Sequence, residues 1–222
     1  PSAPVRNNLP LHDFTGGNTF MGSVVAALYP GETDAAALAA GSARAEATLQ
    51  KAATLDLSLA AEGDSVRATV RVTNRTGHKL PTGYPEGRRM WLNIEARDSN
   101  GALLYASCPY DTSTGVLTPG PQARVYEILL GISKAVAPVL GLPHGASFHF
   151  ALNDSLFKDN RIPPLGFTNA AFDAFGGKPT DPELPGTRYP DGQNWEESTC
   201  ALPVVTATVT ATLYYQTTSK EY

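Results

Sequence analysis

Histidine is the side chain in this sequence best suited to bind a metal ion, because a neutral imidazole nitrogen is a common ligand. The chain has four histidines, His12, His78, His144 and His149. His149 lies in an alternating segment and His144 in a Leu-Pro-His-Gly loop, and a structural role is the stronger interpretation for both. His12 and His78 are therefore the candidate binding residues.

His12 and His78 both lie close to glycines. His12 precedes Gly16-Gly17, where the backbone can approach a flat ligand or a partner closely. It is a candidate ligand to a metal held mostly by another chain or segment. His78 lies in a Thr-Gly-His-Lys-Leu-Pro-Thr-Gly turn whose Gly and Pro residues fix the direction of the imidazole. It either binds a ligand or belongs to a turn held by its own hydrogen bonds.

Several common catalytic signatures are absent from the sequence. There is no Cys-x-x-Cys-His, which excludes covalent attachment of a c-type haem through two thioethers, and no zinc-site spacing. Gly-x-Ser-x-Gly, a phosphate-binding Gly-rich loop and His-Glu-x-x-His are also missing. The net charge of -4 and pI near 5.5 give no basic footprint for nucleic acid. We expect a chain that is not an enzyme, although a site built from distant residues can escape a motif search.

The two cysteines, Cys108 and Cys200, lie far apart, each beside a strand-like segment. This placement favours a disulfide between them, with two free thiols as the alternative. A disulfide implies an oxidising compartment, so we expect an exported protein. No apolar run is long enough to span a bilayer, and residues 1–20 lack the pattern of a signal peptide, which export would already have removed.

Hydrophobic periodicity predicts that the chain has two parts, residues 1–53 and residues 54–222. Residues 1–32 are rich in Pro, Gly and Asn and predict an extended arm. An Ala-rich stretch from Thr33 or Asp34 through Ala53 predicts one helix of about 18 residues. Residues 1–53 are thus an arm plus a helix.

Residues 54–222 predict an antiparallel, Ig-like β-sandwich, because short segments alternate between apolar and polar residues. The predicted strands lie at about residues 55–59, 66–73, 90–96, 103–107, 123–130, 147–152 and 204–216. Residues 153–203 hold much of the Pro and Gly and predict a long loop. Such a loop is usually functional or covered by a partner.

Four groups of residues occur in order along the chain: His12-Asp13-Phe14-x-Gly16-Gly17-Asn18; Asn74-x-Thr76-Gly77-His78-Lys79-x-Pro81-Thr82-Gly83 with Arg88-Arg89-x-Trp91-Leu92; Lys158-Asp159-Asn160-Arg161-Ile162-Pro163-Pro164-x-Gly166-Phe167; and Leu213-x-Tyr215-Gln216. Together they resemble the non-haem β-sandwich region toward the C-terminus of some multihaem c-type cytochromes. The resemblance implies electron transfer in a periplasmic or cell-surface assembly. It also implies that His12 is a distal axial ligand to the iron of a haem c attached elsewhere, since the haem-binding region is absent from this sequence.

The leading hypothesis is a non-catalytic β-sandwich subunit or domain that packs on the haem-bearing protein of a multihaem cytochrome complex. Arg88-Arg89 and Arg161 then either pair with buried acids or bind haem propionates. The rival hypothesis is a structural or adhesion-type surface assembly module with no redox role. A carboxylate site for calcium, for instance at Asp159, is less favoured than solvated loop carboxylates.

Overall fold

The computed structural model describes residues 15–222 with the exception of 85, 183 and 185. His12, the first predicted site residue, therefore lies outside the described residues. The chain forms two compact units, which divide between Lys51 and Ala52. None of the described helices is long and apolar enough to cross a membrane.

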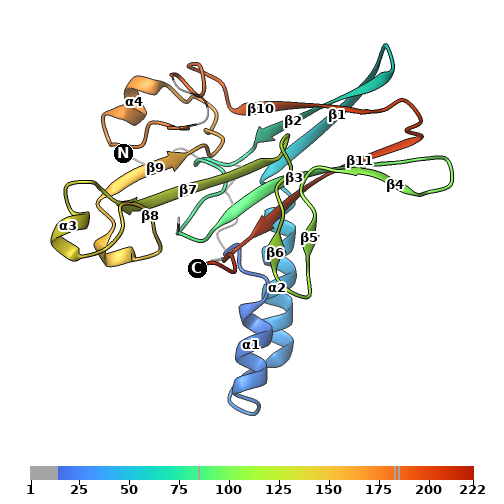
Figure 1. Cartoon of the computed structure of the whole chain (residues 1–222). Coiled ribbons are helices and arrows are strands. Elements are labelled where there is room, and N and C mark those ends of the chain that lie inside the picture. Colours follow the sequence, from blue (N-terminus) through green and yellow to red (C-terminus); the bar gives the residue numbers. More distant parts are fainter. Residues whose placement is uncertain (1–14, 85, 183, 185) are drawn as a thin grey trace, which may run out of the picture. The chain divides into compact units, whose positions relative to one another are not determined.

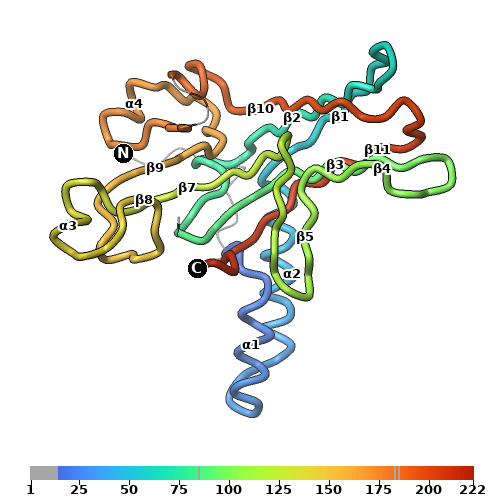
Figure 2. Tube along the Cα trace, viewed as in Figure 1, coloured from blue at the N-terminus to red at the C-terminus, as the bar shows by residue number. Residues whose placement is uncertain are grey.

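The first unit contains two helices that lie side by side, α1 (Met21–Leu28) and α2 (Ala35–Leu49) (Figures 1 and 2). The predicted cap of α2 is confirmed, because the Asp34 carboxylate accepts hydrogen bonds from two backbone amides of the first turn, both at 3.0 Å. The prediction of an arm is wrong for Met21–Leu28. This short apolar helix is stabilised by close packing on α2, since a Cβ at Gly22 would lie 3.2 Å from the Leu38 carbonyl oxygen.

The second unit is built from antiparallel sheets, which confirms the predicted β-sandwich class (Figure 1). One sheet has the order β1-β2-β10, with the bounds β1 (Ala53–Glu62), β2 (Ser65–Asn74) and β10 (Trp195–Pro203). The other has the order β11-β3-β7-β8, with the bounds β11 (Thr208–Gln216), β3 (Arg89–Arg97), β7 (Arg124–Ile132) and β8 (Gly145–Ala146). Two further strands extend this sheet, β4 (Leu103–Ala106) on β3 and β9 (Ser155–Asp159) on β7.

Short elements complete the unit. A small hairpin consists of β5 (Tyr110–Asp111) and β6 (Val116–Leu117). The helical elements are α3 (Ala137–Leu140), a 3₁₀ turn (Phe150–Leu152) and α4 (Asn169–Asp173).

The main core lies between the two sheets. β3 contributes the alternate residues that the sequence predicts to face one way, Met90, Leu92, Ile94 and Ala96, and all four are buried. On the other face of β3, Trp91 packs with Cys108 and Leu117 and stacks on Tyr214, with ring centroids 5.3 Å apart. Strand β3 is thus covered on both faces.

Two predicted segments differ from the structure. The predicted loop over 153–203 is wrong, because it contains β9, α4 and all of β10. β10 buries Glu196 and Ser198 in the same row as Cys200 and Leu202, so its inward face does not look apolar. The predicted strand at 147–152 is also wrong, since the chain turns there into the 3₁₀ helix, and His149 precedes that turn.

The predicted disulfide is wrong in this structure, where Cys108 and Cys200 are both buried free thiols. They belong to separate buried clusters, Cys108 with Trp91 and Cys200 in the main core. Burial raises the pKa of both thiols, so neither is a reactive thiolate. The argument from a disulfide to an oxidising compartment therefore loses its basis.

Candidate functional site

His78 lies exposed on the turn that follows β2. Its backbone carbonyl accepts hydrogen bonds from Asn74 Nδ2 at 2.7 Å and from Thr76 Oγ1 at 2.9 Å. The turn is therefore held by its own hydrogen bonds, the alternative that the sequence left open. A binding role for the exposed imidazole stays a prediction.

The turn around His78 meets the Ile-Pro-Pro segment, although the two are far apart in sequence. Asn74, which is fully buried, donates through Nδ2 to the backbone oxygens of Ile162 at 2.9 Å and Pro163 at 3.0 Å. Leu80 and Ile162 also exchange two backbone hydrogen bonds, at 2.8 and 3.0 Å. Two of the segments that carry the family resemblance thus form one buried junction.

Asp159 supplies the charge at this junction, with an exposed fraction of only 1%. Arg161 donates to both of its carboxylate oxygens at 2.8 Å, and Lys79 forms a second ion pair with it. Burial lowers the pKa of Lys79, and the Asp159 charge opposes that effect. The interpretation of Asp159 as a solvated loop carboxylate is wrong, and the side chain of Arg161 is engaged with an acid.

The Arg88-Arg89 segment is also held within the chain. Arg88 donates to the Thr82 carbonyl at 2.5 Å and lies over the Tyr215 ring. Arg89 donates to Gln216 Oε1 at 2.8 Å and forms an ion pair with a glutamate near the C-terminus at 3.4 Å. The described motif residues are therefore mainly architectural.

A groove of about 750 Å³ lies along β7. Tyr126 of β7 points into the core, so its neighbours Val125 and Glu127 face the groove. The floor and walls are mostly apolar, and they include Leu129 and Phe157. The described lining contains no His, Cys, Ser or Met, and its charged residues include Glu127 and Lys158.

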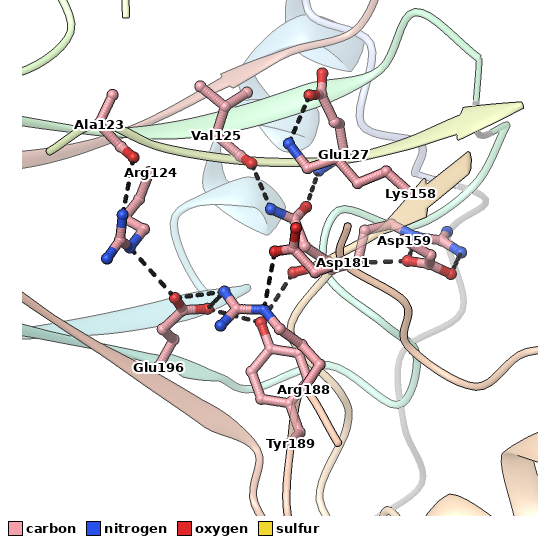
Figure 3. Close-up of polar contacts among 12 residues, drawn as sticks. Ala123, Arg124, Val125, Glu127, Lys158, Asp159, Asp181, Arg188, Tyr189 and Glu196 are labelled. Carbon is pink, nitrogen blue, oxygen red and sulfur yellow. Dashed lines mark hydrogen bonds and ion pairs between the residues drawn. The ribbon is translucent and has the colours of Figure 1, made fainter. Parts of the chain in front are cut away.

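Charged side chains of the groove form a fixed network (Figure 3). Arg188 lies between two carboxylates, with its Nη2 2.6 Å from Glu196 Oε1 and its Nε 3.3 Å from Asp181 Oδ2. Arg124 approaches Glu196 at 3.6 Å, and its side chain is 39% exposed at the rim. Lys158 pairs with Glu127 at 3.1 Å. Arg124 is thus the most accessible of these three cations.

The buried side of the network depends on Tyr189. Its hydroxyl lies 2.7 Å from Glu196 Oε2 and 2.9 Å from the Asn160 carbonyl oxygen. Burial raises the pKa of Tyr189 well above its ordinary value, and the Glu196 charge adds to this effect. Tyr189 therefore stays a neutral donor that fixes Glu196 beneath the rim.

Four exposed aromatic rings form a cluster beside the groove: Tyr84, Phe148, Phe150 and Tyr222. Their exposed fractions lie between 40% and 64%. Consecutive ring centroids are 5.5 to 6.1 Å apart, and the Tyr84 and Tyr222 hydroxyls share a hydrogen bond of 2.9 Å. That hydrogen bond raises the pKa of Tyr84. We call this set the aromatic cluster.

The aromatic cluster and the groove adjoin one another. Phe148 lines two smaller hollows of about 180 and 130 Å³, and the larger of these shares Glu127 and Leu129 with the groove. The sequence patterns did not predict this surface. Two of its aromatic residues, Phe148 and Phe150, lie two positions apart and instead favour the strand predicted at 147–152.

The fold and this surface together define a β-sandwich with a groove along β7 and an adjoining cluster of exposed aromatic rings. Comparison with family models gave no match, and comparison with curated proteins gave none either. Among solved structures, the chain is similar to a penta-heme cytochrome c552 from Thermochromatium tepidum, with 20% identity and a TM-score of 0.52. The match covers 79% of this chain and 34% of that one, so the chain spans about a third of its length. This likeness of fold agrees with the resemblance to multihaem cytochromes.

Proposed function

We propose that this chain is a non-catalytic β-sandwich subunit or domain of a multihaem electron-transfer complex. It packs on the haem-bearing protein through the groove on β7 and the adjoining aromatic cluster. The observation that carries the proposal is that a mostly apolar groove, the accessible Arg124 at its rim and four exposed rings adjoin one another. The fold likeness to a penta-heme cytochrome supports it.

The described residues do not fit a haem of the chain's own. The sequence has no Cys-x-x-Cys-His, and no described His or Met lines the groove. The haem c is therefore held by the partner or by another segment, and His12 is its proposed distal axial ligand. Axial ligation of that kind sets the reduction potential of the iron. The proposed location is the periplasm or the cell surface.

The groove and the rings have different tasks in this proposal. Arg124 pairs with a carboxylate of the partner, such as a haem propionate, because a guanidinium forms strong charge-assisted hydrogen bonds with carboxylates. Exposed aromatic side chains supply large contact areas at interfaces with little loss of conformational freedom. The sandwich thereby limits the access of water to the haem edge.

A structural or adhesion-type assembly module without a redox role is the second candidate. The aromatic cluster favours it equally, since exposed rings are typical of protein interfaces of many kinds. The two candidate functions predict different visible absorption for the native assembly. We would isolate the native assembly, record its visible absorption when oxidised and reduced, and measure the mass of every chain. A haem band that co-purifies with this chain supports electron transfer, and a colourless assembly contradicts it.

Point variants then test the docking face. We expect Phe148→Ala and Arg124→Ala each to weaken retention of the haem-bearing partner about tenfold, the effect of an interface contact of ordinary strength. Phe175→Ala is the matched control, because Phe175 is 92% exposed and makes none of the ring contacts of the cluster. Equal losses for Phe148→Ala and Phe175→Ala would exclude this face.

A separate variant tests His12. We expect His12→Ala to convert one low-spin haem of the intact assembly to a high-spin form, as seen in its absorption and electron paramagnetic resonance spectra. His144→Ala is the matched control, because His144 is exposed and no binding role is predicted for it. Unchanged spectra in the His12 variant would remove axial ligation from the proposal and leave the docking face in place.

A further inference from the structure

The outer edge of β1 is a long strand edge. β1 pairs with β2 over its whole length, from Ala53 opposite Asn74 to Glu62 opposite Ser65, and its register has no shift. Within the described part of the chain, no strand pairs with the other side of β1. A row of backbone donors and acceptors is therefore open there.

The geometry of the hairpin shows which residues carry these open groups. The turn between Glu62 and Ser65 has two residues, so the pair that closes it exchanges backbone hydrogen bonds. Hydrogen-bonded pairs alternate along an antiparallel ladder. The outward N–H and C=O groups consequently belong to the odd-numbered residues of β1, among them Leu55, Leu57 and Leu59.

The side chains of these leucines extend the buried row of β2. Leu57 lies opposite Val70 and Leu59 opposite Ala68, and both β2 residues are completely buried. Leu57 and Leu59 nevertheless remain 39% and 51% exposed. The inward face of the sheet thus stops at an uncovered apolar border.

β1 has none of the usual features that protect an edge from pairing. It contains no Lys, Arg or Pro and no bulge, and its charges are Asp56 and Glu62. β10, at the opposite edge of the same sheet, ends in Pro203 and exposes Glu197. The two edges of one sheet therefore differ in their capacity to pair.

We propose that β1 pairs antiparallel with β1 of a second copy of this chain, which joins two three-stranded sheets into one. The distribution of charge selects the register. Centring the two-fold axis on Leu57 places Leu57 opposite itself and Asp56 opposite Ser58, and centring it on Ser58 also opposes no two carboxylates. The neighbouring registers oppose Asp56 to Asp56 or Asp56 to Glu62.

The charges of β1 thus disfavour the neighbouring registers and allow the two registers that cover its leucines. In both allowed registers leucine meets leucine or alanine on the inward face, and the outward backbone groups of the two copies face one another. This inference needs no haem and no partner protein, so it stands or falls separately from the proposed function.

The first test uses a protein with all 222 residues of this sequence. Sedimentation equilibrium should show a concentration-dependent change from the 23.5 kDa monomer to twice that mass. Hydrogen exchange should show the amides of Leu57 and Leu59 protected in the dimer and exchanging quickly on dilution. A monomer at every concentration, or equal protection of these amides in the monomer, would overturn the proposal.

Variants of Ser58 test the register without touching the leucines. Ser58→Glu should weaken the dimer about tenfold in either register, because the new carboxylate lies opposite Asp56 of the other copy at two symmetric positions, or opposite its own counterpart once. Ser58→Lys should tighten it when Leu57 is at the centre, through Asp56 of the other copy, and weaken it when Ser58 is at the centre. Thr199→Glu is the control, because Thr199 is exposed on β10, and it should leave the dimerisation unchanged. Equal dimerisation of the Ser58→Glu and Thr199→Glu proteins would contradict edge pairing.

Discussion

The junction around Asp159 and the outward face of β7 carry similar residue types but place them in opposite settings. At the junction, Lys79 and Arg161 are mostly buried, and both pair with one carboxylate. On β7, Arg124 reaches the rim of an open groove, and the rings of the aromatic cluster are exposed nearby. Charged groups in the junction hold two loops together, whereas at the groove Arg124 is 39% exposed, and we propose that it contacts a partner. The motif residues are therefore mainly architectural, whereas Arg124 and the rings of the aromatic cluster, which we propose to contact a partner, lie outside the motifs.

The strongest way to break this comparison is Asp159→Asn. It leaves Lys79 and Arg161 buried without their anion, and we expect a loss of about 3–5 kcal/mol in the free energy of unfolding. Urea unfolding measures this loss. Asp64→Asn, in the exposed turn after β1, should stay within about 0.5 kcal/mol. A loss below about 1 kcal/mol for Asp159→Asn would show that the junction is not held by its charges.

The next largest expected effect is a difference in stability between variants of two buried tyrosines. Tyr189→Phe removes a donor from Glu196 and the Asn160 carbonyl and should cost about 1–3 kcal/mol. Tyr126→Phe should cost less than about 0.5 kcal/mol, because the Tyr126 hydroxyl is buried beside Ser198 without a hydrogen bond of normal geometry. Thermal or urea unfolding of both variants gives the comparison. Equal costs would mean that the network under the groove adds no stability.

The same tyrosines predict how stability changes at high pH. Burial raises the pKa of Tyr126 and Tyr189 in the folded state, whereas both ionise near pH 10 when unfolded. The stabilisation that these protonated tyrosines give the folded state is therefore complete below pH 10. It is lost as the pH rises above 10, since only the unfolded chain releases the tyrosine protons. The free energy of unfolding should fall less steeply above pH 10 in Tyr126→Phe than in the wild type. An identical slope would argue against ionisation of Tyr126 on unfolding.

The smallest expected effect concerns His78. His78→Ala should change the free energy of unfolding by less than about 0.5 kcal/mol, because only the backbone of His78 takes part in the hydrogen bonds of its turn. Thr76→Val removes the hydroxyl that donates to that backbone and should cost about 1 kcal/mol. Chemical denaturation distinguishes the two. A larger cost for the histidine would place its imidazole in the architecture of the turn.

Local patterns predicted the elements whose inward faces are apolar. The β1–β2 hairpin, the buried row of β3 and the cap at Asp34 follow from alternation, turn residues and capping chemistry. The sequence pattern did not predict β10, because Glu196 and Ser198 occupy its inward row. Burial of Glu196 is tolerated because it has hydrogen-bond and ion-pair partners from elsewhere in the fold.

The candidate site was harder to predict than the fold. Tyr84, Phe148 and Tyr222 come from three distant segments, and their contacts depend on how the sandwich closes. The resemblance pointed to segments that the structure shows to be mainly internal, such as the pair formed by Asn74 and Ile162. Spacing along the chain gives no information about which of two arginines reaches the surface.

The order of strands in the two sheets has a consequence for how the chain folds. β2 receives its second neighbour from β10, and β3 receives one of its neighbours from β11, yet both partners lie at the end of the sequence. Closing such long loops costs entropy before the stabilising contacts can form, so folding is expected to be slow. During synthesis neither sheet can be completed until the residues from Trp195 to Gln216 have emerged, and the nascent chain has to remain unfolded or protected until then.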